Sequence, residues 1–304
     1  MSKGVHRFAL LVAGATFFLI IAGANVTSHD AGLATSDWPL SNGQFFPRMV
    51  GNLFWEHGHR LVATTVGILT IVLAVYLQMR ERRAWVKRLG WIALGGVIAQ
   101  GLLGGLTVKL NLPLAVSAAH ATLAQLFFLT TVSLAVFTSG SWIEPSVKTR
   151  EEGEGVSLRT LCVFALIAIL AQLVLGATLR HSATWDQPLP TVLLLSHVAG
   201  AIVVTLVLGA TVATVLTRYR AENCIRRAAL VAAGLLLVQL SLGVTAYIVR
   251  AASPSDPQPL NPMISVTVAH VACGALVFAA TIVLTLRAFR ILRGERPAYV
   301  LAAA

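Results

Sequence analysis

Four ionisable residues, Glu56, His57, His59 and Arg60, stand together at the start of an apolar run that reaches Leu77. On a helix, Glu56 and His59 share one face, and the opposite charges of Glu56 and Arg60 are four residues apart and can pair. His57 points away from that face. Ionisable groups are costly at the end of a membrane helix unless they are paired or ligated, so the cluster indicates a functional site.

Three more histidines, His120, His197 and His270, occupy comparable places in later apolar segments. Four histidines near one membrane face, in alternate segments, are hard to explain as isolated packing residues. A histidine pair across the core of a four-helix bundle can ligate haem iron axially. We therefore expect two haem sites, with His59 and His120 at one and His197 and His270 at the other.

A carboxylate accompanies only the first histidine. Glu56-x-x-His59 is similar to the Glu-x-x-His pattern of di-iron bundles, which need two copies and two further glutamates. The residues three before the other histidines are Ser117, Leu194 and Thr267. Glu56 is thus alone, and this asymmetry predicts one reactive haem site with an acid and one electron-carrying site without it.

Cations near the predicted outer helix ends form a second candidate set: Arg60, Lys109, Arg180 and Arg250. Positive side chains are scarce on that side, and arginine suits carboxylates such as haem propionates. We expect these residues to be propionate partners, with snorkelling to lipid headgroups as the alternative.

Membrane helices must position these residues. Only 12% of the 304 residues are charged and 57% are hydrophobic, whereas a soluble domain carries about 25% charged residues. A bilayer span needs roughly 20 apolar residues. We predict an all-α integral membrane protein with eight transmembrane helices, the first being a helix rather than a signal peptide, at 8–27, 58–79, 89–108, 114–138, 159–179, 191–217, 228–249 and 263–287.

A repeat divides the eight spans into two four-helix bundles. Gln-x-x-Leu-Gly begins at Gln100, Gln172 and Gln239, and each time a histidine follows in the next span, while the first span has the glycine but no glutamine. A duplicated bundle explains this pattern, and we interpret the glutamines as interhelical hydrogen-bonding residues. The predicted domains are an N-terminal bundle at 1–140, a cytoplasmic linker at 141–158 and a C-terminal bundle at 159–304.

The net charge of +11 is a topology signal. Most lysines and arginines fall in alternate connections and near the two chain ends, which by the positive-inside rule places both termini in the cytoplasm and the haem sites toward the outer face. This distribution argues against nucleic acid as a partner and for the lipid bilayer with its anionic headgroups. The expected location is the bacterial cytoplasmic membrane.

The first outer connection, residues 28–55, is long and carries aromatic residues between turn residues. Trp38, Phe45, Phe46 and Trp55 alternate with aspartate, glycine, asparagine and proline. Interfacial aromatics predict a loop that lies on the membrane surface. Whether it is a lid over a site or only a connector stays open at this point.

Taken together, these stretches resemble the haem A synthase family of the CtaA type, and the resemblance covers essentially the whole chain. The matching segments are Asp30-Ala31-Gly32-Leu33-Ala34, Asp37-Trp38-Pro39-Leu40-Ser41-Asn42-Gly43, Glu56-x-x-His59-Arg60-Leu61-Val62, Leu103-Gly104-Gly105-Leu106-Thr107-Val108 and Ala118-Ala119-His120, with the later His197 and His270.

The resemblance implies an oxidoreductase that converts the C8 methyl of haem o into the formyl of haem a for cytochrome oxidase. It implies a substrate haem at His59 and His120 and a haem b at His197 and His270. Glu56 matches the acid implicated in catalysis, and the opposing interpretation is that Arg60 keeps Glu56 ionised and purely structural. Implied partners are haem O synthase and a membrane electron donor or acceptor such as a quinone.

One departure from the family pattern lies in the outer loop. Many members carry two cysteines there, at the places that Thr35 and Ser41 occupy in this chain. A thiol–disulfide role of the loop is therefore absent, and the resemblance is to a variant without the cysteine pair.

Three other functions remain as alternatives. The strongest is an electron-transfer cytochrome that binds two b haems and oxidises quinol, against which Glu56 argues weakly. A haem transporter or assembly factor is the second, although broken midplane helices are not evident. A purely structural membrane protein is the third, and it leaves four aligned histidines unexplained.

Overall fold

In the computed structural model, the described part of the chain comprises residues 3–143, 150–152, 155–182, 189–252 and 260–293. Eight of its helices are long and apolar enough to cross a membrane, which confirms the predicted all-α integral membrane protein. They are α1 (Lys3–Ser28), α2 (Asn52–Arg80), α3 (Ala84–Lys109), α4 (Leu114–Thr138), α6 (Leu158–Ser182), α7 (Thr191–Arg218), α8 (Asn223–Ala252) and α9 (Asn261–Ile291).

Most helices are longer than the apolar runs that predicted them. The clearest case is α2, which begins at Asn52 rather than at residue 58, so the whole Glu56–Arg60 cluster is helical. A helix satisfies its own backbone hydrogen bonds and can continue through the interfacial region, where charged side chains reach water. The chain turns into α2 at Gly51, whose φ of 59° is unfavourable for residues with a Cβ.

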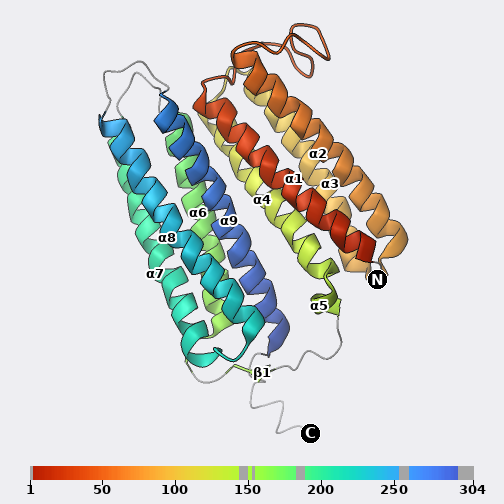
Figure 1. Cartoon of the computed structure of the whole chain (residues 1–304), viewed down its shortest axis with the longest axis vertical. Helices are drawn as coiled ribbons and strands as arrows, with labels where there is room; N and C mark the ends of the chain where they lie inside the picture. The colour runs from red at the N-terminus through yellow and green to blue at the C-terminus, as the bar shows by residue number, and fades with distance from the viewer. Residues whose placement is uncertain (1–2, 144–149, 153–154, 183–188, 253–259, 294–304) are drawn as a thin grey trace.

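The helices form two groups of four that stand side by side (Figure 1). In each group, neighbours in sequence pack together and the first helix packs on the fourth: α1 to α4 form one ring, and α6 to α9 form the other. Helices α1 and α4 meet α6 and α9 between the groups. The same helices of each repeat therefore make the interface, as a duplication with parallel repeats predicts.

This grouping supports the proposed halves at 1–140 and 159–304. Between them lie a short helix, α5 (Gly140–Ile143), and a strand, β1 (Arg150–Glu151), which pairs in parallel with β2 (Leu292–Arg293). The sequence predicted only a polar linker here. Residues 144–149 and 153–154 of that linker lie outside the described residues.

Small and aromatic side chains join the two bundles. Ile20 of α1 and Phe128 of α4 are buried together with Ala275 and Ala279 of α9. Phe128 also stacks on Phe17 of α1, with ring centroids 5.8 Å apart. Alanines let neighbouring backbones approach closely, so this seam is held by van der Waals packing.

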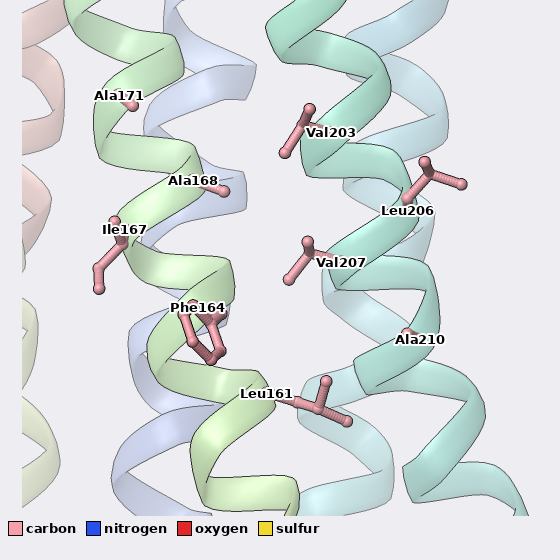
Figure 2. A pocket seen from close by; sticks show the side chains of 9 residues that line it. All are labelled: Leu161, Phe164, Ile167, Ala168, Ala171, Val203, Leu206, Val207 and Ala210. Atoms are coloured by element: carbon pink, nitrogen blue, oxygen red, sulfur yellow. The ribbon is translucent and has the colours of Figure 1, made fainter. Parts of the chain in front are cut away.

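The outward faces of the helices carry exposed apolar side chains. An apolar groove runs between α6 and α7, and Figure 2 shows that the labelled side chains along it are all hydrocarbon. Phe164 is 58% exposed and Leu206 is 67% exposed. A contiguous apolar surface of this kind is normal where lipid tails replace water.

Phe128→Ala tests the seam. Loss of the stacked ring leaves a cavity between the bundles, and we expect a destabilisation of about 3 kcal/mol, the lower end of phenylalanine truncations in protein cores. The readout is the midpoint of thermal unfolding in detergent. Phe164→Ala on the lipid-facing surface is the matched control, and equal midpoint shifts for the two variants would contradict the packing argument.

Candidate functional site

The four histidines of the sequence pattern lie at one end of the molecule. His59, His120, His197 and His270 each fall within the first ten residues of α2, α4, α7 and α9. These helices start at the upper end in Figure 1, on the side of the long 28–51 connection. The structure therefore brings the predicted iron ligands to a common level.

Each histidine ring packs edge-on against a glycine of the preceding long helix. A Cβ at any of these glycines would lie 3.0–3.1 Å from the ring Cε1, so a larger residue would have to displace the ring. The four pairs are Gly23 with His59, Gly104 with His120, Gly176 with His197 and Gly243 with His270.

Glutamine side chains support three of the four histidines. Nε2 of Gln100 donates to the carbonyl of His120 at 2.9 Å and lies 3.1 Å from its Nδ1. Gln172 makes the same two contacts with His197 at the same distances. The predicted interhelical role of the glutamines is therefore confirmed, and their partners are the candidate ligands themselves.

The third glutamine contact differs in detail. Nε2 of Gln239 lies 3.2 Å from Nε2 of His270. Nδ1 of His270 and Nδ1 of His59 are buried, and within the described residues neither has a hydrogen-bond partner. Buried polar atoms are normally paired, so these two nitrogens are open to a partner beyond the described residues, such as a bound ligand.

Both predicted histidine pairs are close in space. The rings of His197 and His270 have centroids 6.3 Å apart with an interplanar angle of 68°. His59 and His120 lie near enough for their charges to interact. Within the described residues, no three His, Cys, Asp or Glu side chains gather as a bare metal ion would need.

The Glu56 carboxylate fastens the 28–51 connection, hereafter the outer loop, to α2. Arg60 Nη2 donates to Oε1 of Glu56, which is the predicted ion pair. The backbone N–H of Thr35 donates to Oε2 at 3.0 Å. Glu56 is buried, so a carboxylate that sequence suggested for chemistry also holds the loop in place.

Arg60 binds the outer loop through its other terminal nitrogen. Nη1 donates to the carbonyl of Asp37 at 2.9 Å, to the carbonyl of Leu40 at 2.5 Å and to Oγ of Ser41 at 3.1 Å. A guanidinium presents several donors in a rigid fork, which suits three acceptors on one loop. The propionate role of Arg60 stays a prediction, and this structure gives the residue an additional loop-binding role.

His57 points toward the loop, on a different face from His59 as predicted. Its Nε2 lies 3.1 Å from the carbonyl of Phe45, and its Nδ1 lies 2.9 Å from Oγ of Ser41. A carbonyl can only accept, so Nε2 carries the hydrogen and Nδ1 accepts from the serine hydroxyl. The sequence alone gave no sign of these partners.

Asp37 organises the tip of the loop. Its carboxylate accepts from the Thr35 hydroxyl, from the N–H of Gly43 at 2.7 Å and from the N–H of Asn42 at 2.9 Å. These hydrogen bonds, that of Thr35 first, hold the pKa of Asp37 well below its usual range. The carboxylate therefore stays ionised and keeps its three donors at any physiological pH.

The loop also rests on α3. Trp38 lies flat on Gly105, where a Cβ would come within 2.6 Å of the indole ring. Lys109 Nζ donates to the carbonyl of Ser36 at 3.3 Å. The loop is thus attached to both α2 and α3. Its outer surface is apolar, because the side chains of Phe45 and Phe46 are 75% and 83% exposed.

Thr35 and Ser41 stand at the two places where many family members carry cysteine, and both are buried. The Thr35 hydroxyl bonds to Asp37, and the Ser41 hydroxyl bonds to His57 and Arg60. In this chain, hydrogen bonds tie these positions to the rest of the loop and to α2.

The remaining predicted cations lie in the C-terminal bundle. Arg180 Nη2 donates to Oγ of Ser28 at 3.0 Å, and that oxygen lies 3.1 Å from Oγ1 of Thr267, so this contact crosses between the bundles. Arg180 stands in the last turn of α6 and Arg250 in the last turn of α8. Guanidinium groups at these helix ends favour an anion beside them.

Comparison with known proteins gives a consistent result. Residues 49–187 match the sequence model of COX15-CtaA, a cytochrome oxidase assembly protein family. Over this segment the chain is similar to the COX15-CtaA family. The match begins just before α2 and so includes Glu56, His59 and His120 together with the first helix of the second bundle.

Several proteins similar to this chain carry the name Heme A synthase. The protein of Symbiobacterium thermophilum is 28% identical over 59% of this chain and 60% of its own length. The Bacillus licheniformis protein is 26% identical over 60% of this chain and 61% of its own. These matches span about three fifths of each relative, and the Geobacillus kaustophilus protein is 24% identical over 80% of this chain and 82% of its own.

Arg60→Gln tests the attachment of the loop. Glutamine cannot form the ion pair with Glu56 and keeps fewer of the hydrogen bonds to the outer loop. Each hydrogen bond to a charged group contributes about 1.5–3 kcal/mol to stability. We expect hydrogen exchange at the backbone amides of Thr35, Asn42 and Gly43 to rise at least about tenfold. Arg48→Gln is the control, because Arg48 is an exposed arginine of the same loop. Unchanged hydrogen exchange at these amides in Arg60→Gln would contradict the attachment of the loop through Arg60.

Proposed function

We propose that the protein is a haem A synthase, which oxidises the C8 methyl of haem o to the formyl of haem a for cytochrome oxidase assembly. The match of residues 49–187 to the COX15-CtaA model and the relatives named Heme A synthase support this. The observation that carries the proposal is an asymmetric pair of sites: two bundles hold similar histidine pairs, but only His59 has a buried carboxylate, Glu56, one turn away.

The residues fit haem groups better than a bare ion. Each site offers two imidazoles, and a porphyrin supplies the remaining nitrogen ligands. With metal–imidazole bonds of about 2 Å, as for zinc, two ring centroids on one metal are roughly 6 Å apart. The 6.3 Å between His197 and His270 matches that spacing. The unpartnered Nδ1 atoms of His59 and His270 and the four facing glycines also fit sites that a ligand completes.

In this proposal, His59 and His120 hold the substrate haem, and His197 and His270 hold haem b. Haem b supplies one-electron transfer when it is bound. Arg180 and Arg250 are proposed propionate partners because they lie in the last turns of α6 and α8, at the outer end of the C-terminal bundle. Arg60 and Lys109 are proposed partners in the N-terminal bundle, where they also hold the outer loop.

Converting a methyl to a formyl group, with one water molecule as the proposed oxygen source, is an oxidation that releases four electrons and four protons. The electrons go to a membrane acceptor, for which a quinone is the proposed class. Glu56 is the proposed proton acceptor, since Arg60 and the N–H of Thr35 hold its carboxylate in one orientation. The outer loop covers this region and limits its access to water.

The proposed orientation puts both termini in the cytoplasm and the histidine sites toward the outer face of a bacterial inner membrane. The supporting observation is that α2, α7 and α9 end in arginines at the end of the bundle opposite the histidines. Haem O synthase is the proposed partner, because it would supply the substrate.

Glu56→Gln separates chemistry from structure. Glutamine keeps the shape and the acceptor oxygen but cannot take up a proton. We expect bound haem at wild-type level and conversion to haem a reduced by at least about 100-fold, the scale of lost acid–base catalysis, with hydroxylated precursor accumulating. The experiment co-expresses a haem O source and resolves extracted haems by reversed-phase chromatography and mass spectrometry; wild-type haem a would sink the catalytic role.

His197→Ala tests the C-terminal site. Loss of one axial imidazole removes the six-coordinate b-type spectrum of the reduced protein, measured by optical difference spectroscopy on purified material. Val198→Ala, at the neighbouring lipid-facing position, is the control. An unchanged b-type spectrum in His197→Ala would exclude this histidine as a ligand.

An electron-transfer cytochrome with two b haems is the second candidate. It is favoured by one observation: both carboxylate oxygens of Glu56 already have protein partners, which suits a structural residue. Haem extraction decides between the two functions. Haem a or its hydroxylated precursor supports the synthase, whereas haem b with unchanged haem o in folded, reducible protein supports the cytochrome.

A further inference from the structure

The support of the candidate ligands is not equal in the two bundles. Gln100, Gln172 and Gln239 each place an amide nitrogen within 3.1–3.2 Å of a ring nitrogen of His120, His197 and His270. Each glutamine stands four residues before the glycine that faces the same histidine. The histidine of α2 is the exception, because the corresponding residue of α1 is Leu19.

The geometry around His59 is otherwise the same. A Cβ on Gly23 would lie 3.1 Å from Cε1 of His59, the same distance as between a Cβ on Gly104 and Cε1 of His120. Leu19 is buried in the core of the first bundle and so occupies the glutamine position without a polar atom. Within the described residues, no hydrogen-bond partner meets Nδ1 of His59; Nδ1 of His270 shares this property, so the missing glutamine is what distinguishes His59.

The glutamines act on the histidines in a specific way. Gln100 and Gln172 bind the backbone carbonyl and contact the ring of the same histidine, so they fix the ring relative to its own helix. Residues that hydrogen-bond a metal ligand orient its ring, and their loss typically weakens metal binding by roughly 10–100-fold. Within the described part of the chain, no side chain supports His59 in this way.

We propose that His59 is the exchangeable ligand of the N-terminal site, because Leu19 stands where the other three histidines have a glutamine. Gln100, Gln172 and Gln239 are then positioning residues for the permanent ligands His120, His197 and His270. This inference rests on the proposed function. A substrate haem has to enter and leave, whereas a cofactor haem stays. The unsupported histidine lies in the bundle that also carries Glu56, and both histidines of the other bundle have a glutamine.

The test compares full-length variants in a background that binds haem only at the N-terminal site, His197→Ala with His270→Ala. Purified protein is loaded with haem, and the rate of haem transfer to excess apomyoglobin is followed by absorbance. Leu19→Gln should slow haem loss about tenfold, and Gln100→Leu should speed it by roughly 10–100-fold. Leu19→Met, which is apolar and of similar volume, is the control and should match the background.

A second readout separates ligand support from general packing. With a loosely held His59, the background protein should show a mixture of five- and six-coordinate haem, and Leu19→Gln should shift it toward the six-coordinate low-spin spectrum. A purely structural role of Leu19 would leave the spin state unchanged and would only lower the unfolding temperature.

The outcomes are distinguishable. The inference is overturned if Leu19→Gln loses haem at a rate within twofold of Leu19→Met. If Leu19→Gln does not fold, the decisive variant is Gln100→Leu, and an unchanged rate of haem loss in that variant overturns the inference. If the background protein binds no haem at all, the proposed N-terminal substrate site fails, and the inference fails with it. Slower haem loss in Leu19→Gln, together with no haem a production by the protein without substitutions, supports the inference and rejects the synthase.

Discussion

The structure depends on one recurring contact, in which a histidine ring lies against a glycine of the preceding long helix. In the hydrocarbon region no water can satisfy an imidazole, so its surroundings must come from neighbouring helices or from a ligand. The glycine lets the ring sit within 3.1 Å of a would-be Cβ, and this close fit fixes where the two helices meet. Because the contact occurs once in each helix pair, it sets the level of all four histidines.

The second constraint joins the outer loop to the N-terminal site. Glu56 and Arg60 are neutralised by each other, and their remaining hydrogen-bonding groups go to Thr35, Asp37, Leu40 and Ser41. Removing one member of a buried ion pair costs about 3–5 kcal/mol because the other charge is left unpaired. The proposed proton acceptor and the cover over the site are therefore energetically coupled, and any change at Glu56 also acts on the loop.

The two bundles share their packing and differ locally. Helices α1 and α4 meet α6 and α9, and both bundles close into the same ring of four. Among the differences at the outer end are Glu56 and Leu19 in the first bundle, and Gln172 paired with His197 in the second. In our proposal, these differences allow the N-terminal site to exchange its haem while the C-terminal site keeps its own.

The sequence alone determined the eight spans, the four histidines at one level and the Glu56–Arg60 pair. All three follow from regular local geometry: a span follows from the length of an apolar run, and the ion pair from the four-residue turn of a helix. It also indicated the repeat, since Gln-x-x-Leu-Gly recurs in the chain.

Only the tertiary structure decided what the loop touches and which histidine lacks support. Thr35 meets Glu56, Ser41 meets His57 and Trp38 meets Gly105 across an irregular segment, where no periodicity relates a residue to its partner. The glutamines were visible as a motif, but their contact with the histidines depends on how two helices rotate and approach each other. That rotation is set by packing over the whole bundle, which no short stretch of sequence specifies.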